Sequence, residues 1–209
     1  MRRHSAAMER ATEPPASLAE IARDIQSCRR CGLWRNATQA AAGEGPPRAP
    51  IMLVGEQPGD QEDLQGRPFV GPAGGVLDRA LAQAGVPREA VFVTNAVKHF
   101  KHELRGKRRL HKRPDASEIS ACRFWLDAER ALVRPKLVVA MGASAILGVF
   151  GRARPVMAWR GRLLPMDGGG EALITFHPSM VLRIPDHEGR ERAFRDFTAD
   201  LALCRSALR

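Results

Sequence analysis

The sequence lacks any apolar run long enough to cross a membrane. A membrane-spanning helix needs about 18 consecutive apolar residues, and the longest candidate, residues 137–150, is shorter and interrupted by Gly142 and Gly148. The N-terminal residues also lack the continuous apolar segment of a secretory signal. With no such signal and only four cysteines, a disulfide framework is disfavoured. We therefore expect a soluble, cytoplasmic protein without a membrane partner.

Lysine is scarce among the basic residues. Only five of the 33 are Lys and 28 are Arg, so the pI near 10.6 is weak evidence for a nucleic-acid partner on its own. The position of the charge is more informative. Residues 98–113 hold eight Lys or Arg and one acid, hence a net charge of +7 out of +10 for the chain. This basic loop indicates a phosphate backbone or another anionic partner; the alternative is a solvated surface.

The pattern of apolar residues predicts a layered α/β domain. The chain has 209 residues, 44% of them hydrophobic, which is enough to bury a core. We expect residues 1–16 to form a disordered leader and residues 17–209 to form the domain. Four segments have the length of buried strands: residues 51–54, 91–95, 136–141 and 172–176. Helical patterns alternate with them at residues 73–84, 116–133, 143–150 and 191–208, and another helix begins near Ser17 and ends at the first cysteine pair. This alternation predicts a parallel sheet.

Polar motifs follow each of the four expected strands. GEQPGD comes after the first strand, Asn95 closes the second, Gly142-Ala-Ser follows the third, and His177-Pro-Ser follows the fourth. In open α/β sheets the ligand crevice lies at the carboxyl ends of the strands. The sequence therefore predicts a binding site where these motifs meet.

The cysteines leave two interpretations open. Cys28 and Cys31 have the spacing of a metal, cluster or redox pair, but they do not follow a strand as a thioredoxin-like pair would. Cys122 and Cys204 lie on expected helices, where a free cysteine is usually a small core residue. From spacing alone, a metal or iron–sulfur site and a set of structural thiols are both possible.

Several motifs occur together in a characteristic order. They are CRRCGLWR, GEQPGDQEDLQGRPFVGPAGGVLDRAL, VTNAVKHFK, GKRRLHK, EISACRFWL and HPSMVLR. Over residues 18–205, the chain resembles the UdgX proteins, an iron–sulfur branch of the uracil-DNA glycosylase superfamily related to the family 4 enzymes. It departs from the usual motifs at Leu110, where Ile is common, and at Met180 in HPSM. The resemblance implies a single three-layer α/β/α domain with a central, mainly parallel four-stranded sheet.

The resemblance also implies a [4Fe-4S] cluster. Its ligands would be Cys28, Cys31, His99 and Cys122, because His99 stands where the family 4 enzymes carry a cysteine. Histidine replaces cysteine at other cluster sites. Cys204 is then left as a core residue. The expected role of the cluster is architectural.

The activity implied by the resemblance is excision of uracil from DNA, followed by a covalent link between the protein and the abasic site. His111 would attack C1′ of the deoxyribose, since a neutral imidazole is a competent nucleophile. Glu56 would favour the cationic sugar and His177 would stabilise the leaving uracil. The expected partner is uracil-containing DNA, with single strands preferred, bound by a monomer.

Further residues are expected to hold the base and the strand. Phe69 would stack on uracil, and the Asn95 amide would match uracil O4 and N3–H; without the resemblance they read as a core Phe and a strand-end Asn. The expected uracil-binding residues are Gln57, Asp60, Phe69, Asn95 and His177, and Asp60 is a second candidate for the carboxylate. The expected DNA-binding residues are Lys107, Arg108, Arg109, Lys112 and Arg183.

Three other functions compete with this one. A conventional family 4 glycosylase would let water attack in place of His111 and turn over many times. A non-catalytic iron–sulfur module would bind uracil-DNA with a strong salt dependence and release no base. An intracellular metal protein unrelated to DNA would leave the basic loop unexplained.

Overall fold

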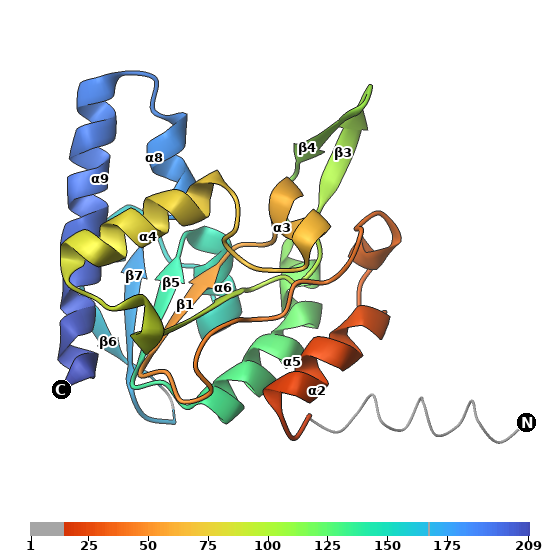
Figure 1. Ribbon diagram of the computed structural model, residues 1–209, viewed down its shortest axis with the longest axis horizontal. Coiled ribbons are helices and arrows are strands. Elements are labelled where there is room, and N and C mark those ends of the chain that lie inside the picture. Colours follow the sequence, from red (N-terminus) through yellow and green to blue (C-terminus); the bar gives the residue numbers. More distant parts are fainter. Residues whose placement is uncertain (1–14, 167) are drawn as a thin grey trace, which may run out of the picture.

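A five-stranded sheet lies at the centre of the computed structural model, which describes residues 15–166 and 168–209 (Figure 1). The strand order is β2-β1-β5-β7-β6; the first four strands are parallel, and β6 is antiparallel to β7. Their bounds are β1 Ile51–Gly55, β2 Val91–Asn95, β5 Leu137–Met141, β6 Leu163–Pro165 and β7 Glu171–Thr175. The predicted α/β class and mainly parallel sheet are confirmed. The predicted number of four strands is wrong, because β6 is a three-residue edge strand containing a proline, too short to give an apolar run.

Helices cover both faces of the sheet, which gives the expected three layers. On β1, Ile51 and Leu53 pack with one set of helices, whereas Met52 and Val54 pack with the other. This alternation follows from the two-residue period of a strand. One layer contains α4 Pro72–Ala84, α8 Ser179–Arg183 and α9 His187–Ala202; the other contains α2 Leu18–Asp24, α5 Ala116–Val133 and α6 Ala143–Phe150 (Figure 1).

Helix α5 begins at the capping box expected from the sequence. The Asp115 carboxylate accepts hydrogen bonds from the backbone N–H groups of Ser117 and Glu118, and Glu118 accepts from the backbone of Asp115. These bonds satisfy N–H groups that have no partner within the first helical turn. The cap fixes the start of the helix that presents Cys122 and Trp125 on its buried side.

The segment expected to be a basic loop is a β-hairpin instead. Strands β3 (His102–Arg105) and β4 (Arg108–His111) pair antiparallel and project from the body of the molecule (Figure 1). Gly106 takes a φ of 60° in the tight turn between them, a conformation that glycine adopts without strain. The strands contain no alternation of buried apolar residues, so the apolar pattern could not reveal them.

The two ends of the chain differ from the expectation in detail. Residues 1–14 of the predicted leader lie outside the described residues. The C-terminal helix α9 begins at His187 rather than near residue 191, because Asp186 caps it, and it continues beyond Ala202 as a 3-10 helix, Leu203–Leu208. The remaining short elements are α3 Asp60–Gln65, α7 Val156–Trp159 and three 3-10 turns, Ile25–Ser27, Leu33–Arg35 and Arg88–Ala90. Within the described residues, no helix combines the length and the apolar character that a membrane span requires.

Candidate active site

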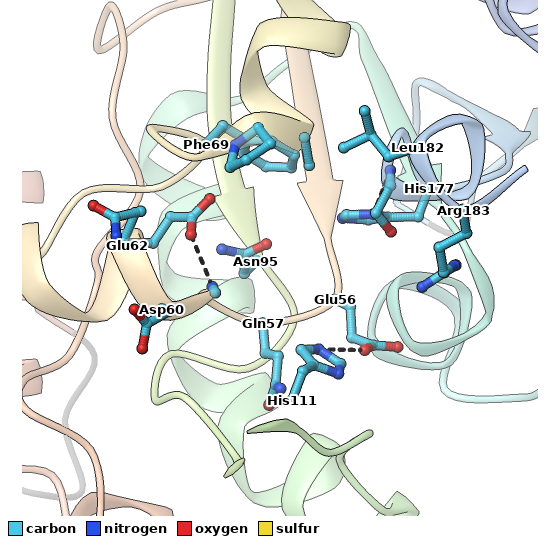
Figure 2. Close-up of a pocket in the computed structure, with 15 residues that line it drawn as sticks. Glu56, Gln57, Asp60, Glu62, Phe69, Asn95, His111, His177, Leu182 and Arg183 are labelled. Carbon is cyan, nitrogen blue, oxygen red and sulfur yellow. Dashed lines mark hydrogen bonds and ion pairs between the residues drawn. The ribbon is translucent and has the colours of Figure 1, made fainter. Parts of the chain in front are cut away.

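A cavity of about 570 Å³ opens at the carboxyl ends of the parallel strands. This volume is typical of sites that hold a small ligand or a single base. Polar motifs that the sequence places far apart meet there, as expected. Its lining residues include Glu56, Gln57, Asp60, Phe69, Asn95, His111, His177, Leu182 and Arg183 (Figure 2).

Glu56 lies at the topological switch point of the sheet, where the strands that follow β1 in the chain lie on opposite sides of it. It follows β1, which lies between β2 and β5, and its carboxylate accepts a hydrogen bond of 2.5 Å from the Ser144 hydroxyl beyond β5. The other carboxylate oxygen lies 3.2 Å from His111 Nε2 (Figure 2). Burial raises the pKa of Glu56, but the hydrogen bonds from His111 and Ser144 outweigh it, so the pKa is lower than usual. Glu56 is therefore a carboxylate at neutral pH.

His111 reaches this carboxylate from the end of β4. Its side chain is 48% exposed, so a ligand in the cavity has access to the ring. The Phe100 ring lies beneath it, with 6.1 Å between the two ring centroids. The structure thus brings an accessible imidazole and an ionised carboxylate together at the cavity.

Phe69 and Asn95 form one wall of the cavity, and Gly55 allows their close approach. A Cβ atom at residue 55 would lie 2.3 Å from Asn95 Oδ1 and 2.7 Å from the Phe69 ring. Phe69 itself has a φ of 58°, an uncommon backbone conformation outside glycine that tends to occur at functional sites. The Asn95 side chain is 3% exposed, and its amide has no hydrogen-bond partner among the described residues. The amide is therefore free to bind a ligand.

His177 faces this wall across the cavity. Its ring stacks toward Phe69 with 6.0 Å between centroids. Burial, with smaller contributions from Arg183 and His111, lowers the pKa of His177 to about 4, so the ring is neutral near pH 7. The backbone N–H of Ser179 donates to His177 Nδ1 at 3.2 Å. Because Nδ1 accepts, we assign the ring proton to Nε2, which makes His177 a neutral hydrogen-bond donor.

Two of the predicted ligand contacts hold the hairpin instead. The Gln57 amide donates to the backbone oxygens of Lys101 and Lys112 and accepts from Lys101 N, so it joins both ends of the hairpin. Arg109 binds Asp60 at 2.7 Å and the fully buried Asp63 at 2.5 Å, both in α3. Gln57 and Asp60 line the cavity, but their side chains are engaged in fixing the strand that carries His111.

The other predicted DNA-binding residues lie on the hairpin and on α8. Lys107 and Arg108 are exposed at the hairpin turn and form no ion pair with any described residue. Lys112 pairs with Glu103 across the hairpin at 3.0 Å. Arg183 lines the cavity from α8, on the side of His177. Of these four cations, only Arg183 lines the cavity itself.

None of the four predicted metal ligands lines the cavity. Cys28, Cys31 and Cys122 belong to one packed cluster, and burial together with the neighbouring Cys28 and Cys31 raises the pKa of Cys122 to about 12. His99 is buried and follows Lys98 in the chain. The backbone N–H of Lys98 donates a hydrogen bond to Cys122 Sγ at 3.2 Å. Across residues 15–166 and 168–209, no three His, Cys, Asp or Glu side chains converge as ligands of a single metal ion.

Ser144 is the functional residue that the sequence did not single out by itself. The Gly142-Ala-Ser motif was expected at the site, but no role was assigned to the hydroxyl. Its contact with Glu56 joins residues separated by 88 positions in the chain. The position of Ser144 after a strand end was the sequence signal that could have identified it. Its contact with Glu56 is visible only in the folded structure.

Comparisons with known proteins identify a family and several relatives. The family model for the uracil DNA glycosylase superfamily matches residues 42–202. The chain is 35% identical to the type-4 uracil-DNA glycosylase of Sulfurisphaera tokodaii, over 81% of this chain and 78% of that protein. It is 34% identical to the type-4 uracil-DNA glycosylase of Thermotoga maritima, over 84% and 88%. With the type-4 uracil-DNA glycosylase of Archaeoglobus fulgidus the identity is 33%, over 90% and 94%.

Proposed function

The chain belongs to the uracil-DNA glycosylase superfamily, and on that premise we propose that it excises uracil from DNA and remains covalently attached to the abasic site through His111. The observation that carries the covalent step is the 3.2 Å contact between His111 Nε2 and the Glu56 carboxylate inside the cavity.

Base recognition uses the wall opposite His177. A flipped uracil stacks against Phe69, and the free Asn95 amide donates to O4 and accepts from N3–H. Cytosine presents the reverse pattern of donor and acceptor at these positions. His177 donates from Nε2 to O2. Selectivity for uracil therefore depends mainly on the orientation of one buried amide.

Cleavage produces opposite charges on the base and the sugar. The electron pair of the C1′–N1 bond leaves with uracil, and the neutral His177 donor stabilises the resulting anion. The Glu56 carboxylate stabilises the oxocarbenium-like sugar, whose positive charge develops at C1′ and the ring oxygen. Since Glu56 is ionised at neutral pH, this assistance needs no prior proton transfer.

The covalent bond forms between an imidazole nitrogen and C1′. The lone pair of the neutral ring attacks C1′, and the alkylated ring becomes positively charged. Its remaining N–H stays hydrogen-bonded to the Glu56 carboxylate, which faces the ring and offsets the new positive charge. The protein is left joined to the abasic deoxyribose, and uracil is the released product.

We propose a [4Fe-4S] cluster as the resident cofactor, because the predicted donors, three thiols and one imidazole, have the chemistry that such a cluster requires. Cys28, Cys31 and Cys122 would supply thiolates and His99 the fourth ligand. Burial, with a smaller effect from Arg29, lowers the pKa of His99, which favours the neutral ring that a metal binds. Two N–H groups already point at sulfur: Trp125 Nε1 lies 3.2 Å from Cys28 Sγ, and Lys98 N lies 3.2 Å from Cys122 Sγ. Bonds of this kind orient cluster ligands. The cluster would join the N-terminal segment, the base of the hairpin and α5.

The second candidate is a conventional glycosylase with multiple turnover. The named relatives, all type-4 uracil-DNA glycosylases at 33–35% identity, favour it. In that case water takes the place of His111, and the His111–Glu56 contact only orients the carboxylate. A non-catalytic DNA-binding module is the third candidate.

A denaturing gel with uracil-containing single strands separates these candidates. We expect a complex that survives denaturant and a ratio near one uracil released per protein. His111→Ser should abolish the complex, whereas His102→Ser, which changes the residue directly opposite on the hairpin, should retain it. Release of many uracils per protein without a complex would establish conventional turnover. Binding without release would establish a non-catalytic module.

The same assay addresses strand preference and oligomeric state. We propose that the protein acts as a monomer and prefers single strands, from which a base is flipped without breaking a pair. Complex formation should then be faster on a single strand than on the matching duplex. Size-exclusion chromatography with light scattering should give the mass of one chain, 22.9 kDa.

A further inference from the structure

The hairpin carries one large apolar side chain on the same face as His111. The ladder pairs His102 with His111 and Leu104 with Arg109. Directly opposed residues of an antiparallel pair point to the same side, and so do alternate residues of one strand. Leu104, Arg109 and His111 therefore share a face, and Arg109 and His111 on that face contact residues that line the cavity.

Leu104 is one of the two most exposed large apolar side chains in the described part of the chain. It is 70% exposed, although it is flanked by the most basic segment of the molecule. Figure 1 shows that this end of the hairpin stands clear of the body of the molecule. A ligand that covered the exposed leucine would gain the free energy of burying its apolar surface.

The charges around Leu104 identify that ligand as a polyanion. Several cations of the segment are already neutralised: Lys98 by Glu129, Lys101 by Asp115 and Glu118, and Arg109 by Asp60 and Asp63. Arg105, Lys107 and Arg108, at the turn, have no acidic partner among residues 15–166 and 168–209. The uncompensated charge is thus concentrated at the turn next to Leu104, which matches a phosphate backbone.

We propose that Leu104 packs against the base next to the flipped uracil, while Arg105, Lys107 and Arg108 bind the phosphates of the same strand. This inference rests on the proposed function, because it takes uracil-DNA as the ligand. Leu104 lies two residues along the strand from the His102–His111 pair, about 7 Å at the usual rise. A stacked DNA strand advances about 3.4 Å per nucleotide, so Leu104 is within reach of the immediate neighbours of the reacting nucleotide.

Base flipping supplies the reason for an apolar contact at this position. When uracil leaves the stack, one face of each neighbouring base loses its partner and becomes exposed to water. Proteins that distort DNA commonly insert a leucine or a similar side chain at such a gap. Leu104 would fill the gap from the side of the hairpin and hold the neighbouring base while His111 reacts.

The test measures binding to a strand that contains 2′-fluoro-deoxyuridine. The fluorine opposes the cationic sugar, so the strand binds without being cleaved. Leu104→Ala should weaken binding about tenfold, the effect expected for losing the burial of most of a leucine side chain. The slope of log K against log salt should stay as in the unmodified protein, because no phosphate contact is lost. Lys107→Ala, in contrast, should reduce that slope by about one.

Two further variants serve as controls. Met157→Ala removes a side chain that is also 70% exposed, on α7, and should leave binding unchanged. Leu104→Met keeps an apolar side chain and should restore most of the affinity. A 2-aminopurine base beside the uracil analogue should fluoresce differently with the unmodified protein and with Leu104→Ala, because only the former covers that base.

The outcomes separate this inference from the proposed function. If the unmodified protein neither releases uracil nor forms a covalent complex, the proposed function is wrong. If the unmodified protein releases uracil or forms the complex, and Leu104→Ala binds the strand as tightly as the unmodified protein, only the role of Leu104 is refuted. A loss of affinity accompanied by a reduced salt slope also refutes it, since Leu104 would then act only by placing the cations.

Discussion

Replacing Ser144 by alanine should narrow the pH range over which the protein reacts with uracil-DNA. The Ser144 hydroxyl is buried and donates to Glu56 Oε2 at 2.5 Å. This hydrogen bond favours the ionised carboxylate and helps to lower the pKa of Glu56. Without it, the carboxylate should take up a proton at a higher pH.

The direction and the size of the effect follow from that contact. A carboxylate with a lowered pKa assists the reaction above that pKa, and the assistance is lost as the pH falls through it. Hydrogen bonds to charged groups contribute about 1.5–3 kcal/mol. We take the lower limit because the Glu56 side chain remains 22% exposed. The alanine variant should therefore react about tenfold more slowly on the acidic side and at the same rate on the alkaline side.

Single-turnover release of uracil, measured from acidic to mildly alkaline pH, tests this prediction. The acidic limb of the profile should move to higher pH in Ser144→Ala. Ser206→Ala is a matched control, since that hydroxyl is exposed and donates only to the Leu203 backbone. If the rates of the unmodified protein and of Ser144→Ala are equal, or differ by the same factor at every pH, Ser144 does not control the ionisation of Glu56.

Three other changes test the packing around the site. Lys98→Met should lower the free energy of unfolding by about 3–5 kcal/mol in urea denaturation, because it leaves the fully buried Glu129 without its cation; Lys98→Met with Glu129→Leu should recover much of the loss. Gly55→Ala should abolish binding of uracil-DNA while the circular dichroism spectrum stays native, since the new Cβ would overlap the Asn95 amide. Since the proposed [4Fe-4S] cluster would need the Cys122 thiolate, Cys122→Ser should give purified protein with less iron and less visible absorbance than the unmodified protein, and a lower melting temperature.

The sheet could be predicted from the sequence because parallel strands are buried on both faces. Residues 51–55 and 91–95 are buried at every position, so they appear as short continuous apolar runs. The start of α5 was equally clear, since its capping box is a local signal. Strand β6 and the hairpin gave no such signal. Their pairing depends on a neighbouring strand and on contacts with distant residues rather than on an apolar pattern of their own.

The location of the site could be predicted from the sequence, but the contacts between its side chains could not. The strand-end rule located Glu56, Asn95 and His177 at one edge of the sheet, and the structure brings them to one cavity. The sequence could not show that the Gln57 amide is occupied by the backbone of the hairpin. Nor could it show that Ser144 is the partner of Glu56. Contacts of this kind join residues that are dozens of positions apart and depend on details of side-chain orientation.

The spacing of Arg109 and His111 in the GKRRLHK motif has a physical explanation in the hairpin. Arg109 and His111 are two residues apart on β4, so both point to the cavity side of the hairpin. Arg109 is fixed by the buried carboxylate of Asp63, and this anchor sets the position from which His111 meets Glu56. A shift of one residue between them would turn the imidazole to the opposite face. Arg109 therefore serves to aim His111, and the cations at the turn remain free to hold the strand.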